Sequence, residues 1–296
     1  MLTCALVLFF ACAGDGEDSG DPGASPGWES TPYEPDLEDA GATPQLTASD
    51  VEAALDEVVP RLRDFHAGAV VDTYEEVMAL GSGGCPDVTS FEGTVYWGES
   101  CSTGAGVTFT GEGELTTFED EYLDLPSFVW DGRDLYVEAT MTTSQGTWDG
   151  AGVAWQRYGE PTAQGAFPTW TSRIAGTFSY EGSDTWLGGS LRPHLDLSIT
   201  LDQLDQAREA TINGGVTGLE SAAEAAWFHE VLSLEASSCP EEPEGTLLVR
   251  DTAGGWYELA FDDTCDGCGA VLFDGTDIGE ACIDIGPLHA WDTAPW

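Results

Sequence analysis

The residues of this chain whose types and spacing could support chemistry are, above all, its cysteines. Two of the eight, Cys4 and Cys12, lie in an apolar run at the N-terminus. The other six follow much later, at Cys85, Cys101, Cys239, Cys265, Cys268 and Cys282. An even set of this kind in an exported chain favours disulfides, although the even number alone leaves several pairings open.

A repeated pattern narrows these pairings. In the stretches 85–111 and 239–275, a Cys-Pro pair precedes a Glu-Gly-Thr triplet, and a second cysteine precedes a Val-x-Phe-x-Gly run at the same distance. The repetition predicts a duplicated β unit with a cysteine pair in each copy. If the copies are equivalent, the disulfides are Cys85–Cys101 and Cys239–Cys265, which leaves Cys268–Cys282.

Two alternatives use free thiolates. A zinc site could combine the last four cysteines, but structural zinc sites usually contain two close cysteine pairs, and here only Cys265 and Cys268 are close. A redox site could use the same C-x-x-C motif, but such motifs open a helix, and a strand-like sequence follows this one. Disulfides are therefore preferred, and no metal is expected at the cysteines.

Histidines and acids give no catalytic signature. The four histidines, His66, His194, His229 and His289, lie far apart and form no H-x-H or H-E-x-x-H motif. With 54 acidic residues in the chain, no two of them stand out as a glycosidase pair. We predict no catalytic residue and no cofactor.

Calcium is a weak possibility at one acidic cluster. Asp274, Asp277 and Glu280 recur every three residues and are the candidates for such a site. A solvated loop is the preferred interpretation, because calcium requires roughly six to eight oxygen ligands.

Tryptophans on or beside predicted strands have two possible roles. Exposed in a row they would stack against sugars, and buried they would fill a core. Most alternate with polar neighbours, which favours the core. The six in question are Trp97, Trp130, Trp148, Trp155, Trp170 and Trp186.

The charge of the chain excludes some classes of partner. There are 54 acidic residues against eight arginines and no lysine, which gives a formal net charge of −46. A field of this sign repels phosphates, so we exclude nucleic acid, and we expect membrane contact only through a lipid anchor. The acidity fits solubility in salty water or, as the less favoured explanation, binding of divalent cations.

The first 12 residues have the features of a bacterial signal peptide. Residues 2–12 form an apolar run too short to span a bilayer, and the run ends in Ala11-Cys12, which resembles a lipobox. Residues 13–46 are rich in Gly, Pro, Ser and acids, so we predict a disordered linker. We predict that Cys12 carries a lipid; ordinary cleavage near Ala13, followed by secretion, is the alternative.

The remaining pattern begins with helical spacing over residues 49–80. Ser49 and Glu52 match a capping box, Pro60 should divide the helix, and Gly81 is a suitable end. From Cys85 the period changes to two, which indicates strands separated by Gly, Asp and Pro.

This alternation continues to about Leu201. Residues 203–211 and 218–228 are predicted to form short helices or a crossover. Residues 246–262 are predicted to form a hairpin, and residues 269–275 to continue the sheet. The predicted fold is mainly β: an antiparallel meander forming a sandwich or an open half-barrel, with the helical segment 49–80 packed on it. We expect a single domain over residues 47–288 and a tail at 289–296.

Three features together resemble the uncharacterised acidic surface lipoproteins of myxobacteria and related GC-rich bacteria. They are the FFAC end of the leader, the acidic Gly-rich spacer and the CP…CDGCG…C arrangement. The resemblance implies a place in the cell envelope, at the outer membrane or cell surface, but no activity. We expect a non-enzymatic binding or scaffolding role; the alternatives are a carbohydrate-binding module that uses exposed Trp and a secreted hydrolase.

Overall fold

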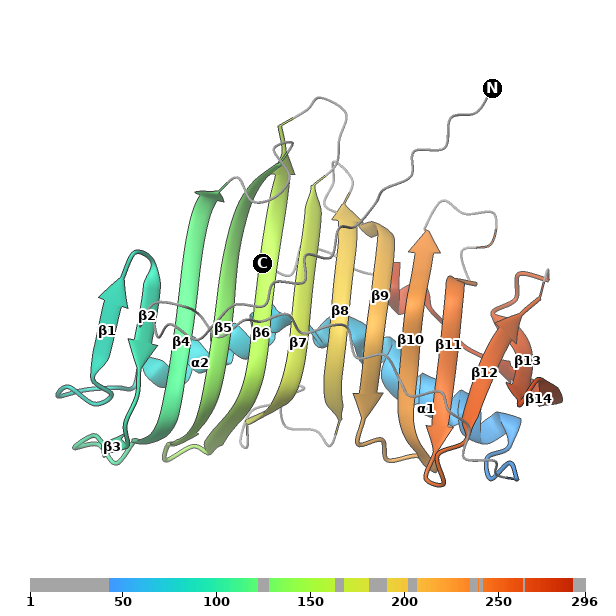
Figure 1. Ribbon diagram of the computed structural model, residues 1–296, viewed down its shortest axis with the longest axis horizontal. Coiled ribbons are helices and arrows are strands. Elements are labelled where there is room, and N and C mark those ends of the chain that lie inside the picture. The colour runs from blue at the N-terminus through green and yellow to red at the C-terminus, as the bar shows by residue number, and fades with distance from the viewer. Residues whose placement is uncertain are drawn as a thin grey trace, which may run out of the picture. The chain divides into compact units, whose positions relative to one another are not determined.

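The computed structural model forms one large antiparallel sheet with helices on one of its faces (Figure 1). It describes residues 43–121, 128–162, 168–180, 191–201, 207–234, 239, 242–262 and 264–289. Contacts divide the chain into two units, Met1–Thr31 and Pro32–Trp296, and every element below belongs to the second.

The sheet has 14 strands, which follow one another across it almost without exception. The order is β1-β2-β4 and then each strand in turn to β14, with β3 paired to β4. The strands are β1 (Val88–Phe91), β2 (Thr94–Trp97), β3 (Cys101–Ser102), β4 (Thr108–Glu121), β5 (Phe128–Thr142), β6 (Thr147–Pro161), β7 (Thr169–Tyr180), β8 (Arg192–Leu201), β9 (Ala207–Thr217), β10 (Ala223–Leu234), β11 (Glu244–Asp251), β12 (Trp256–Phe261), β13 (Cys268–Phe273) and β14 (Thr276–Cys282).

This architecture confirms the predicted fold class, a mainly β antiparallel meander with a helical segment packed on it. The sheet is single and open, so the described strands do not form the two facing sheets of a sandwich.

One part of the strand assignment was wrong. Residues 203–211 and 218–228 were expected to hold short helices or a crossover, but their described parts contribute to β9 and β10. These two strands pair along most of their length, with Trp227 opposite Gly215. Partners on both sides override the helical preference of the Ala- and Glu-rich sequence.

The helical segment consists of three pieces, α1 (Ala48–Val58), the 3-10 helix η1 (Val59–Asp64) and α2 (Ala67–Met78). The capping box differs from the expected one: Thr47 is the N-cap, its Oγ1 accepts from the Asp50 amide, and Asp50 Oδ2 accepts from the Thr47 amide. Ser49 already lies inside the helix. Pro60 lies in η1, where the path of the chain changes, as its missing amide proton predicts.

The two α-helices cover different parts of the same face. α1 packs on β10, β11 and β14, and α2 packs on β5, β6 and β7 (Figure 1). The C-terminal turn η3 (Gly286–His289) contacts η1 and β9, between these two regions. The helical segment therefore runs across the strands and shields one side of the sheet, and we call the other side the open face.

Large side chains fill the space between helices and sheet. Burying each of them contributes about 1.5–3 kcal/mol. Two indoles also find polar partners on α2: Trp97 Nε1 donates to Tyr74 Oη over 2.8 Å, and Trp148 Nε1 to Thr73 Oγ1 over 3.2 Å. The largest fully buried side chains are Trp97, Trp148, Trp170, Tyr257, Phe65, Phe109, Phe178 and Phe228.

Glycine allows a close approach between two of the longest strands. Gly152 on β6 faces Gly176 on β7, with φ of 147° and 141°. A Cβ on Gly152 would overlap the carbonyl oxygen of Ala175, and one on Gly176 would overlap that of Ala151. Positive φ and the lack of space both require glycine here, and such kinks let a wide sheet bend.

The structure contains three disulfides, Cys85–Cys101, Cys239–Cys265 and Cys268–Cys282, the pairs expected from the repeated spacing. The two stretches differ in local structure. Glu92-Gly93 forms the turn between β1 and β2, whereas Glu244-Gly245 opens β11 opposite an irregularity in β10. The duplication therefore stays a prediction, and Cys12 lies outside the described residues.

Candidate functional site

Polar and aromatic side chains cross the open face in register. Asp134, Trp155, Arg173 and Asp196 lie opposite one another on β5, β6, β7 and β8. The guanidinium carbon of Arg173 lies 5.4 Å from the centre of the Trp155 ring, and Arg173 Nη2 donates to Asp196 Oδ2 over 2.6 Å. Stacking and ion pairing therefore order this row.

A groove lies further along the same face, across β7 to β12. Its volume is about 450 Å³, within the usual range for small-molecule sites. Small residues, Gly176, Gly215 and Ala225, form part of its lining. The other residues that line it are Thr177, Arg192, Pro193, His194, Thr217, Glu224, Trp227, Arg250 and Trp256.

Sheet register explains why these residues meet. Arg192, Thr217, Ala225, Arg250 and Trp256 occupy one row across β8 to β12. Since side chains on one face recur every second residue, the neighbouring row brings His194, Gly215 and Trp227 beside them. Residues as far apart in sequence as 192 and 256 thus line one groove.

The two indoles of the groove differ in their surroundings. Trp227 is buried, and a Cβ on Gly215 would overlap its ring, so the indole lies closely over that glycine. Trp256 is half-buried and stacks against Arg250, whose guanidinium carbon lies 5.5 Å from the ring centre. Trp256 therefore offers flat apolar surface with a cation at its edge, and Trp227 forms a buried part of the groove wall.

The charge of the groove differs from that of the chain as a whole. Arg192 and Arg250 contribute two positive charges and Glu224 one negative charge. Arg250 Nε and Glu224 Oε2 are 3.8 Å apart, too far for a hydrogen bond, and Arg250 Nε is buried. Burial lowers the pKa of His194, against the influence of Asp196 and aided by Arg173, which favours a neutral imidazole at pH 7.

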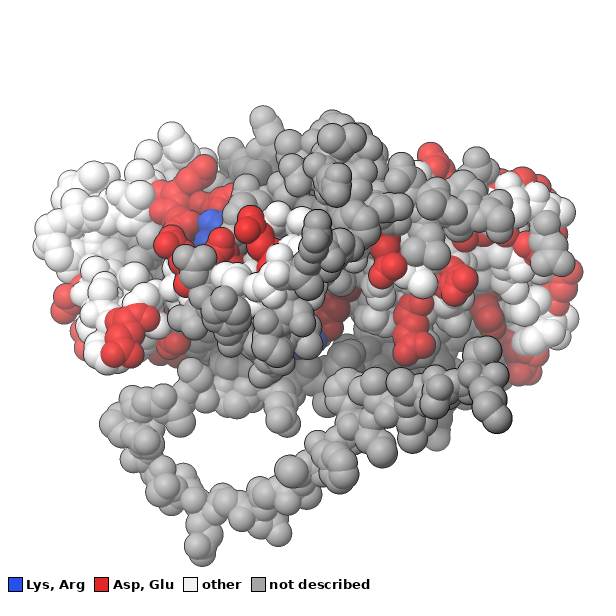
Figure 2. Space-filling view, turned by 90° about the horizontal axis from the view of Figure 1, so that it is seen from above, with Lys and Arg blue, Asp and Glu red and all other residues white. Residues whose placement is uncertain are grey.

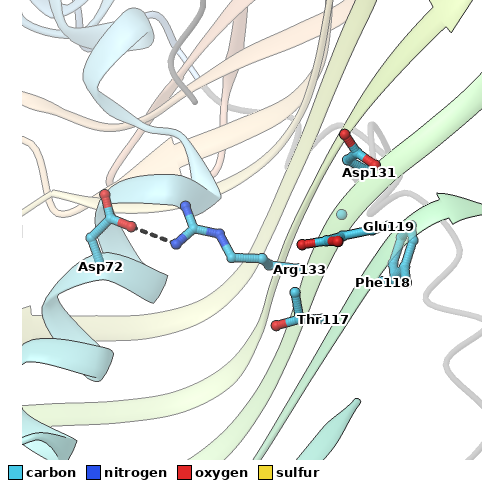
Figure 3. A pocket seen from close by; sticks show the side chains of 7 residues that line it. Asp72, Thr117, Phe118, Glu119, Asp131 and Arg133 are labelled. Carbon is cyan, nitrogen blue, oxygen red and sulfur yellow. Dashed lines mark hydrogen bonds and ion pairs between the residues drawn. The ribbon is translucent and has the colours of Figure 1, made fainter. Parts of the chain in front are cut away.

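A second pocket, of about 470 Å³, lies on the other face, between α2 and strands β4 and β5. Arg133 reaches across it to α2, where Nη1 donates to Asp72 Oδ1 over 2.7 Å (Figure 3). The same nitrogen donates to Glu75 Oε2 over 3.1 Å. Glu119 and Asp131 add two more carboxylates (Figure 3).

The surroundings of this second pocket are strongly acidic. Seen from above, acidic side chains gather in this part of the molecule (Figure 2). The residues that line this pocket form an ion-paired link between α2 and the sheet, and no histidine is among the described residues that line it.

The structure separates most of the residues singled out from the sequence. Asp274 lies in the turn between β13 and β14, and Asp277 accepts from the Gly279 amide over 2.9 Å. Among the described residues, the groups of three ligand atoms within 4.8 Å of one another all contain disulfide cysteines, so Asp274, Asp277 and Glu280 do not converge.

The histidines also lie in different places. His66 precedes α2, His194 lines the groove, and His229 is exposed on β10. His289 ends η3. These four histidines therefore do not form one centre.

The tryptophans divide between core and open face. Trp97, Trp148 and Trp170 are fully buried and Trp130 is buried, as preferred from their alternation, whereas Trp155 is half-buried on the open face. Trp186 lies outside the described residues. Two other tryptophans, Trp227 and Trp256, line the groove, and sequence reasoning missed both. Their alternation with small neighbours was the signal available for them.

Comparisons with known proteins place this chain in no family. No family model matches it, and neither a curated protein nor a solved structure shows significant similarity to it. Among the described residues, no helix has the length and apolar character needed to cross a membrane.

Proposed function

We propose that this chain is a non-enzymatic binding protein of the bacterial cell envelope, and that its ligand occupies the open-face groove. The observation that carries this proposal is the combination of Trp227, Trp256 and Arg250 around a lining of small residues. Stacking surface, a cation and free volume in one place are what a small-molecule site needs. Apart from the acidic α2 pocket, side chains instead fill the core between helices and sheet.

The ligand class that suits the groove is a saccharide with a carboxylate. Indole faces bind the apolar faces of sugar rings, and a guanidinium pairs with a carboxylate through two parallel hydrogen bonds. Arg250 already stacks on Trp256, so both contacts can be made at one end of the groove. A singly charged ligand also meets less long-range repulsion from a chain of net charge −46 than a polyphosphate would.

The envelope part of the proposal is supported by the leader. The apolar run, Ala11-Cys12 and the polar spacer are the features of a lipid-anchored exported protein. Intact-mass measurement of the exported chain should find diacylglycerol on Cys12 at the new N-terminus. An unmodified chain that begins at residue 13 or later would contradict the anchor.

Binding should be tested by calorimetric titration with neutral and carboxylate-bearing mono- and oligosaccharides. We expect a carboxylate-bearing sugar to bind, and Trp256→Ala to weaken its binding at least tenfold, about 1.4 kcal/mol. Trp155→Ala is the matched control, because it removes an indole from the same face outside the groove.

Two outcomes would contradict this assignment. One is equal loss of binding in Trp155→Ala and Trp256→Ala, and the other is the absence of binding by every sugar of the panel. The hydrolase alternative gains no support, because no histidine with two acids lines the groove or the α2 pocket among the described residues.

A further inference from the structure

Exposed apolar side chains gather at one end of the molecule. Four large hydrophobic residues of the described chain are exposed: Leu80 (45 %), Val88 (48 %), Phe91 (71 %) and Tyr96 (44 %). All lie between residues 80 and 96, in the segment after α2 and in the β1–β2 hairpin. Exposed apolar residues scattered singly need no explanation, but a concentration of them marks an interaction surface.

The strand at this end is an unprotected sheet edge. β1 pairs only with β2 in the sheet, all four of its residues are exposed, and its sequence, Val-Thr-Ser-Phe, carries no charge. Edge strands offer unpaired backbone groups to another chain, and proteins usually protect them with charges or with a covering element.

The opposite edge has both kinds of protection. β14 carries Asp277 and Glu280, and α1 packs against it. Glu52 on α1 accepts from the Cys282 amide over 3.2 Å, and Gly279 lies against Ala48. One edge of the same sheet is therefore covered and charged, while the other is neither.

We propose that β1 pairs with β1 of a second copy, which extends the sheet across a two-fold axis. The distribution of charge on the chain favours a second copy as the partner. A cationic partner would gain more by binding elsewhere on a chain of net charge −46, whereas a second copy can approach most closely at a strand that carries no charge. Asp87 and Glu92 flank β1, so salt must screen their repulsion for the two copies to pair. Figure 2 shows mostly uncharged side chains at the β1–β2 end, together with a few acidic ones.

Hairpin geometry supports such pairing. Phe91 and Thr94 flank a two-residue turn and, with Thr89 and Tyr96, lie in register. Residues that flank such a turn exchange their hydrogen bonds, so Val88 and Ser90 direct their backbone groups to the free edge. Residues paired between the two copies must point to the same face of the sheet, so the two-fold axis lies between two copies of the same residue. Near the centre of β1 this residue is Thr89 or Ser90. The disulfide Cys85–Cys101 ties the segment before β1 to β3.

Sedimentation velocity of the exported chain carrying Cys12→Ser, which removes the site of the proposed lipid, tests the association. We expect a monomer–dimer equilibrium that shifts towards dimer as salt rises, because salt screens the repulsion between like-charged copies. Adding Val88→Glu and Phe91→Glu should weaken the dimer at least tenfold. Thr252→Glu, at an exposed turn between β11 and β12, should leave the equilibrium unchanged.

A cross-linking experiment tests the geometry separately. Single substitutions Thr89→Cys and Ser90→Cys should each be oxidised in turn, and at least one should form a disulfide between copies, whereas Thr252→Cys should not. A chain that stays monomeric at 100 µM (roughly the upper range of weak specific dimers) in high salt would overturn the proposal. So would a dimer that survives the paired Glu substitutions or fails to cross-link at both positions.

Discussion

Acidification should destabilise this protein through His66, although most of its titrating groups are carboxylates. His66 precedes α2, and its ring lies edge-on to Trp170, with ring centres 5.8 Å apart. Burial lowers the pKa of His66 from 6.5 to about 4; Asp72 opposes the shift and Arg133 supports it. The folded protein therefore holds this imidazole neutral under conditions in which the unfolded chain protonates it.

The sign and size of the effect follow from these two values. Between pH 6.5 and 4 the unfolded state binds more protons than the folded state, so stability is present above pH 6.5 and is lost as pH falls towards 4. Each pH unit between the values corresponds to about 1.4 kcal/mol, which gives about 3 kcal/mol in total. His66 keeps some contact with water, so we expect about 2–3 kcal/mol.

Urea denaturation of the wild type and of His66→Gln at pH 7.0, 5.5 and 4.5 measures this effect. The difference in unfolding free energy between the two proteins removes the contribution of the carboxylates, which they share. It should change by about 2 kcal/mol over this range, with the wild type losing more stability. His229→Gln, at an exposed position, should follow the wild type at every pH. A difference that stays constant with pH would refute the reasoning.

Further predictions concern the interactions that hold the sheet and helices together. Tyr257 Oη accepts hydrogen bonds from the Gln45 and Leu46 amides and donates one to buried Asp251. Tyr257→Phe should therefore lower the unfolding free energy by about 3 kcal/mol. The control Tyr96→Phe, at an exposed position, should lower it by about 0.5 kcal/mol or less. Urea denaturation at pH 7 measures both, and equal losses would contradict the role of Tyr257. Replacing Cys85 and Cys101 by Ala removes a disulfide that spans 16 residues and should cost about 3 kcal/mol by the same measurement, whereas an unchanged midpoint would show that the bridge does not constrain the unfolded chain.

The sequence predicted the parts of the fold that depend on local pattern or internal repetition. Alternation identified the meander, and the repeated spacing gave all three disulfide pairs that the structure contains. The helix start was harder, because Thr47 with Asp50 and Ser49 with Glu52 both match a capping box. Only packing of the helix against the sheet selects one of two overlapping candidates.

The strands β9 and β10 and the groove could not be predicted for a different reason. An Ala- and Glu-rich segment such as 218–228 favours a helix locally, and only pairing with β9 and β11 makes its second half a strand. The groove depends on the register of six strands, which brings Arg192 and Trp227 to one groove and places Arg250 opposite Trp256. The spacing of residues along the chain does not indicate which residues become neighbours across the sheet.

The central claim is that a ligand binds in the open-face groove, and the indole N–H signals of the protein test it most directly. A ¹H–¹⁵N NMR titration of the exported chain with a carboxylate-bearing saccharide should shift the signals of Trp227 and Trp256 and the Nε–H signal of Arg250. The signals of Trp97 and Trp148, which are fully buried in the core, should not move. Shifts confined to other tryptophans, or no shift at saturating sugar, would contradict the claim.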